Sequence, residues 1–287
     1  MVLGVTMISM KELQSIDLSS YTTIFTGISV LFSVILALVA TILIAILSPG
    51  SIGVAIYIIP TIIVGTFMIG IYRYFSEALF FNFVSKKLKN IKIALNDGEI
   101  VKISPTETAT ILATIATIQA ILIYLISVLI LPLMINSTIQ TLMLSGQEMI
   151  AYELYQLLLI ISQPMTIIMF IFGTFIITFV FILIGVYIYN MLASRGRGIV
   201  LGLSEENGMT VVDSIDMMKF AIAVSIIGGV LNLILGIIML ISGGSAVTLI
   251  TNVVSGFVGG FISAALIAIF YNFLAPKLGK LKIKLTI

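Results

Sequence analysis

The chain has 287 residues, of which 60% are hydrophobic and 9% are charged, and its formal net charge is +2. A soluble domain of this length could not bury so much apolar surface, so the composition indicates a membrane protein whose apolar side chains face lipid. Cys and His are both absent, which excludes disulfides, thiolate chemistry, imidazole general bases and the usual zinc sites.

Long apolar stretches follow one another along the chain. Crossing the hydrocarbon region takes roughly 20 apolar residues as a helix, and helices are expected because lipid offers no partner for unpaired backbone groups. The stretches that are long enough are Thr23–Leu47, Gly53–Val84, Ala109–Ile135, Ser162–Leu192, Phe220–Ile241 and Val247–Leu274. The sequence therefore predicts six transmembrane helices.

The positive charges are distributed unevenly between the loops that join these stretches. Of the fourteen Lys and Arg, only Arg73 lies inside an apolar stretch. The others precede the first stretch, follow the sixth, or lie between the second and third and between the fourth and fifth. Positive residues stay on the cytoplasmic side. We therefore expect a multi-pass protein of the cell membrane with cytoplasmic N- and C-termini.

The basic loops could also bind nucleic acid or anionic lipid. Acidic residues are mixed among the cations, at Asp97, Glu99, Glu205, Glu206 and Asp213. The favoured explanation is therefore that the basic loops only set the orientation of the helices in the membrane. The expected partners are the lipid bilayer and other membrane-protein subunits, and nucleic acid is not among them.

The chain leaves its even-numbered stretches in the same way three times. The segments FNFVSKKLKNIKIAL (81–95), YNMLASRGRGIVLGL (189–203) and YNFLAPKLGKLKIKL (271–285) align without gaps. The alignment superimposes Asn82, Asn190 and Asn272, then a cation, then apolar residues that alternate as in a strand. This register predicts tandem repeats at 1–95, 96–203 and 204–287.

Each repeat crosses the membrane twice, so successive repeats are expected to be parallel. The predicted fold is an all-α polytopic membrane protein with six transmembrane helices, short cytoplasmic β-hairpins and three repeats in pseudo-threefold arrangement. The second repeat carries an insertion at about 136–156. This insertion could lie on the outer surface as an amphipathic helix, or it could extend the fourth transmembrane helix.

Short strands are expected at both ends of each repeat. Asn96-Asp97-Gly98 and Asn207-Gly208 are hairpin signals at the two junctions between repeats. The strand after the sixth helix has no hairpin partner downstream, so we expect it to pair with Glu12–Ile16. Helix N-caps are expected at Asp17, Ser104 and Asp216.

The openings and endings of these units share a pattern. Ile103-Ser104-Pro105 opens the second unit, and Tyr271-Asn272 followed by Leu281–Leu285 ends the third. In these residues the unit resembles a family of small two-helix membrane proteins of unknown function from bacteria and archaea. The pattern is incomplete elsewhere, since Phe81 replaces the Tyr and other residues replace the Pro at 18 and 217. The resemblance implies three fused copies and implies no activity.

Arg73 and Glu77 are the best candidates for a functional site, at i,i+4 in the second stretch. Ionisable residues inside a membrane are costly and often functional, which would suggest a substrate or proton site. A structural ion pair is the favoured interpretation, since a single pair makes a poor pathway.

Asn82, Asn190 and Asn272 each lie about one turn before the cations. Around a common axis they could line a constriction. We favour a structural role, in which each amide pins a neighbouring helix or strand. A cytoplasmic tyrosine belt is also expected, at Tyr72, Tyr74, Tyr187, Tyr189 and Tyr271.

The sequence carries no catalytic motif, and we expect no enzyme activity, no cofactor and no metal. The favoured function is a scaffold, an assembly factor or an accessory subunit of a membrane complex. The alternative is a channel or carrier along the pseudo-threefold axis. Its polar lining would then be Arg73, Glu77 and the three aligned Asn residues.

Overall fold

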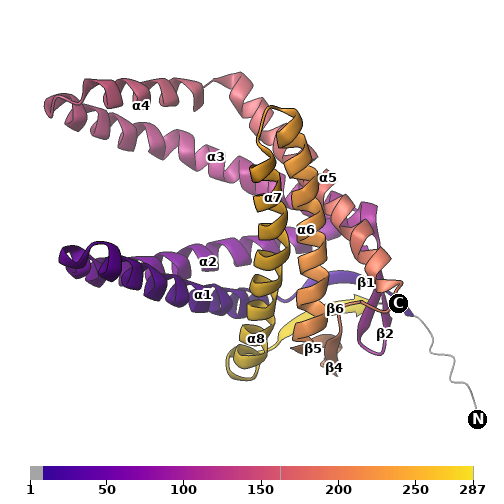
Figure 1. Ribbon diagram of the computed structural model, residues 1–287. Helices are drawn as coiled ribbons and strands as arrows, with labels where there is room; N and C mark the ends of the chain where they lie inside the picture. The colour runs from indigo at the N-terminus through magenta and orange to yellow at the C-terminus, as the bar shows by residue number, and fades with distance from the viewer. Residues whose placement is uncertain (1–8, 162, 287) are drawn as a thin grey trace, which may run out of the picture. The chain divides into compact units, whose positions relative to one another are not determined.

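The computed structural model describes residues 9–161 and 163–286, which are mostly helical and contain one six-stranded sheet (Figure 1). In chain order the elements are β1 (Ser9–Ile16), α1 (Leu18–Leu47), η1 (Pro49–Val54), α2 (Ala55–Ser85), β2 (Ile91–Asn96), β3 (Glu99–Ile103), α3 (Pro105–Leu144), α4 (Glu148–Ile161), α5 (Pro164–Ala193), β4 (Leu201–Glu206), β5 (Met209–Ile215), α6 (Met217–Ile241), α7 (Ala246–Val254), η2 (Ser255–Gly259), α8 (Gly260–Leu278) and β6 (Leu281–Thr286). The chain divides into two compact units. One contains Met1–Thr108 and Leu183–Ile287, and the other contains Ala109–Ile182.

Six helical spans among the described residues are long and apolar enough to cross a membrane. They are Leu18–Leu47, Ile52–Ser85, Pro105–Leu144, Pro164–Ala193, Met217–Ile241 and Ala246–Leu278. They coincide with the six expected stretches, and their mean hydropathy runs from 2.3 to 3.1. In the sixth span, a π-helical turn, η2, joins α7 to α8. The candidate spans confirm the prediction of six helices that are long and apolar enough to cross a membrane.

The unit Ala109–Ile182 contains α4 and most of α3 and α5. Helix α3 is 40 residues long and includes 136–144. It ends at a turn in which the N–H of Gln147 bonds to the carbonyl of Leu142 at 2.9 Å. Helix α4 then forms a separate helix of 14 residues. The prediction that the insertion extends the fourth transmembrane helix is wrong, because that helix begins afresh at Pro164.

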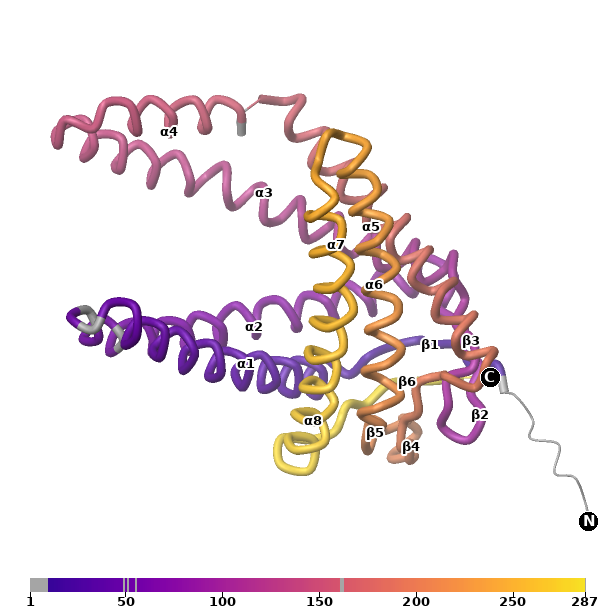
Figure 2. Tube along the Cα trace, viewed as in Figure 1, coloured from indigo at the N-terminus to yellow at the C-terminus, as the bar shows by residue number. Residues whose placement is uncertain are grey.

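All six strands belong to one antiparallel sheet, in the order β3-β2-β1-β6-β5-β4. The hairpins β2–β3 and β4–β5 occur as predicted, with positive φ angles at the turn residues Asp97, Gly98, Asn207 and Gly208. The first and last strands also pair, with Leu13 opposite Leu285 and Ile16 opposite Ile283. Figures 1 and 2 show β1 and β6 side by side. This confirms the predicted pairing of the two strands.

The strands at the two ends of this order, β3 and β4, meet as well. Glu99 forms an antiparallel bridge with Val200. The N–H of Ile100 donates to the carbonyl of Ile199 at 2.9 Å, and the N–H of Leu201 donates to the carbonyl of Gly98 at the same distance. These bonds close the six strands into a ring, which we call the strand collar. Closure gives both edge strands backbone partners.

The strand that precedes each helix pair carries a β-bulge at the same place, two residues before its end. The register passes over Gln14 where β1 meets β6, over Val101 where β3 meets β2, and over Asp213 where β5 meets β4. A bulge adds one residue outside the ladder and bends its strand. Each bend thus lies just before the chain leaves the strand collar for a helix.

A buried core lies where helices meet the strand collar. One cluster joins α1, α8 and β5, and its buried members are Ile24, Ile28, Val212, Tyr271, Leu274 and Ala275. Leu, Ile, Phe and Met side chains on other parts of the helices are exposed. Such exposure is expected of helices that face lipid.

Candidate functional site

The three aligned Asn residues make the same pair of hydrogen bonds. The Oδ1 of Asn82 accepts from the N–H of Ile16 at 2.8 Å, and its Nδ2 donates to the carbonyl of Ile16 at 2.7 Å. Asn190 holds both backbone groups of Ile103 in the same way, at 2.8 Å each. Asn272 holds those of Ile215, at 2.9 Å each. We call each of these paired contacts an Asn clamp.

Each Asn clamp holds the last residue of a strand that enters a helix. An isolated strand end carries an N–H and a carbonyl that need partners. The side-chain amide supplies both partners at once, and it comes from the second helix of the same helix pair. The clamp therefore fixes the distance between the end of one helix and the start of the other.

The residue after each clamped Ile bonds to a strand from another part of the chain. The N–H of Asp17 donates to the carbonyl of Lys282, that of Ser104 to Lys92, and that of Asp216 to Val200, each at 2.9 Å. The three acceptors occupy the same position in the aligned segments. The bond from Asp17 to Lys282 links the first helix pair to the last strand.

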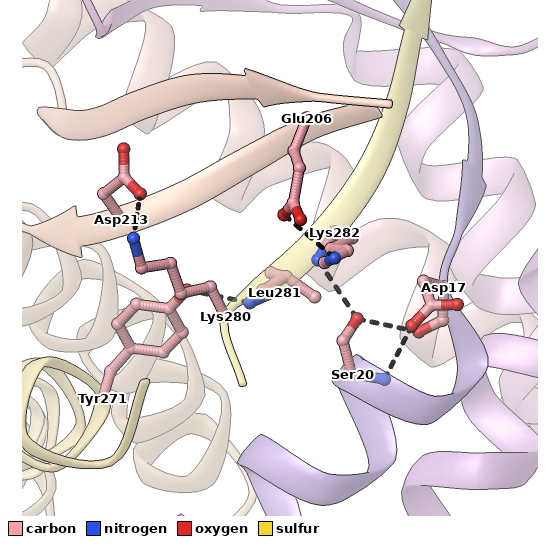
Figure 3. Close-up of polar contacts among 8 residues, drawn as sticks. All are labelled: Asp17, Ser20, Glu206, Asp213, Tyr271, Lys280, Leu281 and Lys282. Atoms are coloured by element: carbon pink, nitrogen blue, oxygen red, sulfur yellow. Dashed lines mark hydrogen bonds and ion pairs between the residues drawn. The ribbon is translucent and has the colours of Figure 1, made fainter. Parts of the chain in front are cut away.

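Side-chain caps form at two of the three predicted helix starts. Asp17 accepts from the N–H of Ser20 at 2.8 Å, and Asp216 accepts from that of Lys219 at 2.9 Å, as predicted. The hydroxyl of Ser104 instead accepts from the N–H of Lys92 in β2 at 3.0 Å. In Figure 3, the hydroxyl of Ser20 plays the same part for the N–H of Lys282, at 3.1 Å.

Two tyrosines add a second link between strands, and sequence reasoning placed them wrongly. Tyr189 and Tyr271 are only 3% and 1% exposed, so they do not belong to an interfacial belt. The hydroxyl of Tyr271 donates to the carbonyl of Val212 in β5. It also accepts from the N–H of Leu281 in β6, as Figure 3 shows. Tyr189 makes the same two bonds, with Ile100 and Ile199.

The remaining members of the predicted belt behave differently from one another. Tyr72 and Tyr187 are 46% and 59% exposed, as a belt requires. Tyr74 contacts the hydroxyl of Ser29 at 2.7 Å. The two buried tyrosines differ from the exposed ones in that each directly precedes the Asn of a clamp in the sequence. At this position the side chain points toward the strands. Phe81 occupies that position in the first segment and is 4% exposed.

Ion pairs link different strands of the collar. Lys280 pairs with Asp213 at 2.7 Å, and Lys282 pairs with Glu206 at 3.0 Å (Figure 3). Lys92 and Glu12 lie 3.7 Å apart. Hydrogen bonds from Lys280 and then from Ser204 lower the pKa of the Asp213 carboxyl below its ordinary value. Some of the cations that indicate topology thus also hold the strand collar together.

Arg73 and Glu77 form the expected pair, with the Nε of Arg73 3.0 Å from a carboxylate oxygen of Glu77. The other carboxylate oxygen accepts from the hydroxyl of Tyr21 on α1 at 3.1 Å. The two side chains differ in exposure, at 63% for Arg73 and 24% for Glu77. Glu77 is therefore the better buried partner, and its second bond ties α2 to α1.

The chemistry of these groups is that of structural attachment. Within residues 9–161 and 163–286, no three His, Cys, Asp or Glu side chains gather so as to hold a metal ion. The clamp amides and the two buried tyrosine hydroxyls all bond to backbone groups of the strand collar. In comparisons with known proteins, the chain matches no family model, no curated protein and no solved structure.

Proposed function

We propose that the chain is built from three parallel two-helix repeats around a pseudo-threefold axis, inserted in the cell membrane by its six spans. The support is the recurrence of the Asn clamp and of the β-bulge at aligned positions. Because β1 and β6 pair, the described ends of the chain lie on one side of the membrane. The cation-rich segments that lead into β2 and β6 support the proposal that this side is the cytoplasmic one.

The function that fits this construction is a non-catalytic scaffold, assembly factor or accessory subunit of a membrane complex. One observation carries the proposal. In the channel alternative, the three Asn side chains would line a pathway. In the clamps, both the oxygen and the nitrogen of the side-chain amide are instead hydrogen-bonded to the ends of the strands. The strand collar then fixes the ends of helix pairs whose other faces are apolar and exposed, as a platform for membrane partners requires.

A channel or carrier is the second candidate, and one cavity favours it. The cavity has a volume of about 480 Å³ and lies between α1 and α2, lined by Ser29, Ser33 and Thr66 together with Phe32 and Leu36. Serine and threonine residues around a hollow between membrane helices would suit a polar solute. The scaffold remains the preferred proposal because Glu77 and the Asn clamps are occupied by structural contacts.

The two candidates predict different behaviour of the purified full chain. In liposomes, a scaffold leaves the leakage of potassium, protons and small anions at the level of empty vesicles. After mild detergent extraction, native mass spectrometry should find the chain with another membrane protein in fixed stoichiometry. Solute flux well above empty vesicles, reduced by Ser33→Leu or Thr66→Leu, would establish the carrier and reject the scaffold. A chain that is always extracted alone would also count against the scaffold.

A further inference from the structure

A polar cavity lies where the end of α2 meets β1 and β6. Its volume is about 540 Å³, and its lining includes Gln14, Ser15, Ser85, Lys86, Asn90 and Lys284. The β-bulge at Gln14 contributes to it, because the carbonyl of that residue turns to accept from the hydroxyl of Ser85 at 3.1 Å. A hollow of this size matches an ordinary small-ligand site.

The lining of this cavity carries positive charge without a carboxylate. Lys86 and Lys284 are both exposed side chains, one at the end of α2 and the other on β6. In the part of the chain that the structure describes, neither forms an ion pair. The end of α2 contributes roughly half a negative charge through its carbonyl groups. The carboxylate of Glu12 accepts from the Asn90 amide at 3.1 Å, but it also lies 3.7 Å from Lys92, which balances its charge. The two lysines exceed the charge of the helix end, so the cavity attracts anions.

The aligned position at the end of α8 has a carboxylate at the bulge, which the bulge beside α2 lacks. There Asp213 occupies the bulge position that Gln14 occupies here, and Lys280 stands where Asn90 stands. Lys280 and Asp213 pair at 2.7 Å, so the positive charge at the end of α8 is balanced by a carboxylate. At the end of α2 the cations are present, and the bulge residue is an uncharged amide.

The cavity adjoins the end of the second candidate span, where a membrane interface is expected. The second candidate span ends at Ser85, and Lys86 is the residue that follows. Phosphate groups of lipids concentrate at this height, and lysine side chains near the ends of spans attract them. A phosphate presents several acceptor oxygens to the lysine ammonium groups, the Ser15 hydroxyl and the Gln14 amide.

We propose that this cavity binds the phosphate of a phosphate ester, held by Lys86 and Lys284. At this height the ester group belongs to an anionic lipid headgroup or to a soluble phosphate ester. Both share the chemistry of the site, and the experiment separates them. The proposal does not depend on whether the protein is a scaffold or a carrier.

The test uses the full chain in a neutral detergent and follows its thermal unfolding. Phosphatidylglycerol in the micelle should raise the melting temperature by several degrees, and the same amount of phosphatidylcholine should not. The variant Lys86→Gln/Lys284→Gln should bind phosphatidylglycerol about tenfold more weakly or worse, because it loses two charge-assisted hydrogen bonds. The matched control is Lys87→Gln/Lys89→Gln, which removes equal charge outside the cavity and should retain the full shift.

A second variant places an anion inside the site. Gln14→Asp creates at this bulge the carboxylate found at Asp213. The change should abolish the shift without lowering the melting temperature of the lipid-free protein. An equal loss of the shift in both lysine variants would overturn the proposal in favour of surface charge alone, as would the absence of any shift. A shift with glycerol 3-phosphate and none with phosphatidylglycerol would assign the cavity to a soluble phosphate ester.

Discussion

The ends of α2 and α8 hold the strand collar by the same Asn clamp, but the two clamps differ in their exposure and in the neighbouring side chains. Asn82 and Asn272 each make two bonds to the backbone of a strand end. At α8 the clamp is exposed, and the buried hydroxyl of Tyr271 adds two further bonds. At α2 the clamp is half-buried, and Phe81 stands in place of the tyrosine.

The difference shows which contacts the architecture requires and which it can exchange. The Asn clamp occurs at all three aligned positions, whereas the additional anchor is a tyrosine hydroxyl at two of them and a serine hydroxyl, Ser85, at the third. The Lys280–Asp213 pair occupies a place that is a hollow at the end of α2. Where the supporting contacts are fewer, we expect the clamp to contribute more to stability.

The largest effect is therefore expected from Asn82→Ala. The change leaves the N–H and carbonyl of Ile16 without side-chain partners in a half-buried place, which should cost about 2–4 kcal/mol of unfolding free energy. Asn272→Ala should cost about half as much, because its clamp is exposed and Tyr271 remains. Thermal and denaturant unfolding in detergent measure both values. Asn252→Ala, which loses only a 3.5 Å contact with the Met239 sulfur, is the control. A greater loss from Asn272→Ala would reverse the comparison.

Tyr271→Phe removes the anchor that α2 lacks. It should cost about 1–3 kcal/mol, since it leaves a buried carbonyl at Val212 and a half-buried N–H at Leu281 without the tyrosine hydroxyl. The same unfolding assay applies, and hydrogen exchange should rise at Leu281. Tyr187→Phe, at a tyrosine that is 59% exposed, serves as the matched control. If the two changes were equivalent, the buried hydroxyl would have no part in holding the strand collar.

The pair on α2 has no counterpart on α8, where Ser263 and Ile267 occupy the aligned positions. Glu77→Ala should cost about 1–2 kcal/mol, because it removes the acceptor of Tyr21 and the partner of Arg73. Arg73→Ala should cost less, since an exposed i,i+4 pair contributes about 0.3–0.5 kcal/mol. A double-mutant cycle in detergent and in nanodiscs measures the coupling. If Arg73→Ala destabilised more than the double variant, the pair would be buried in hydrocarbon.

The smallest effect concerns Asp213, whose counterpart at the α2 end is the uncharged Gln14. Its pKa is lowered in the folded protein by the hydrogen bonds from Lys280 and Ser204. Its contribution to stability is thus fully present above the unfolded pKa of about 3.9. It is lost as the pH falls through the lower folded pKa. The melting temperature of Asp213→Asn should accordingly fall less steeply below about pH 4 than that of the wild type.

The sequence alone predicted the features that depend on neighbouring residues. Apolar length predicts the six candidate spans. The Asn-Asp-Gly and Asn-Gly turns predict the hairpins, since these residues adopt positive φ at low cost. Even the pairing of β1 with β6 follows from the sequence, because only one segment remained to cover the last strand. The ion pair of Arg73 with Glu77 follows from their i,i+4 spacing in the same way.

What only the tertiary structure decided are contacts between residues that lie far apart in the chain. From the sequence, a tyrosine at the end of a span fits an interfacial belt as well as a buried anchor. Tyr271 is an anchor because the course of the backbone brings it to Val212, which is 59 residues away in the chain. The bulge at Gln14 depends on how β1 bends toward α1, and this bend cannot be predicted from hydrophobic periodicity. The cavity between Lys86 and Lys284 exists only because the pairing of β1 with β6 brings the end of α2 to the last strand. Periodicity determines which residues share a face, but the course of the backbone determines which faces meet.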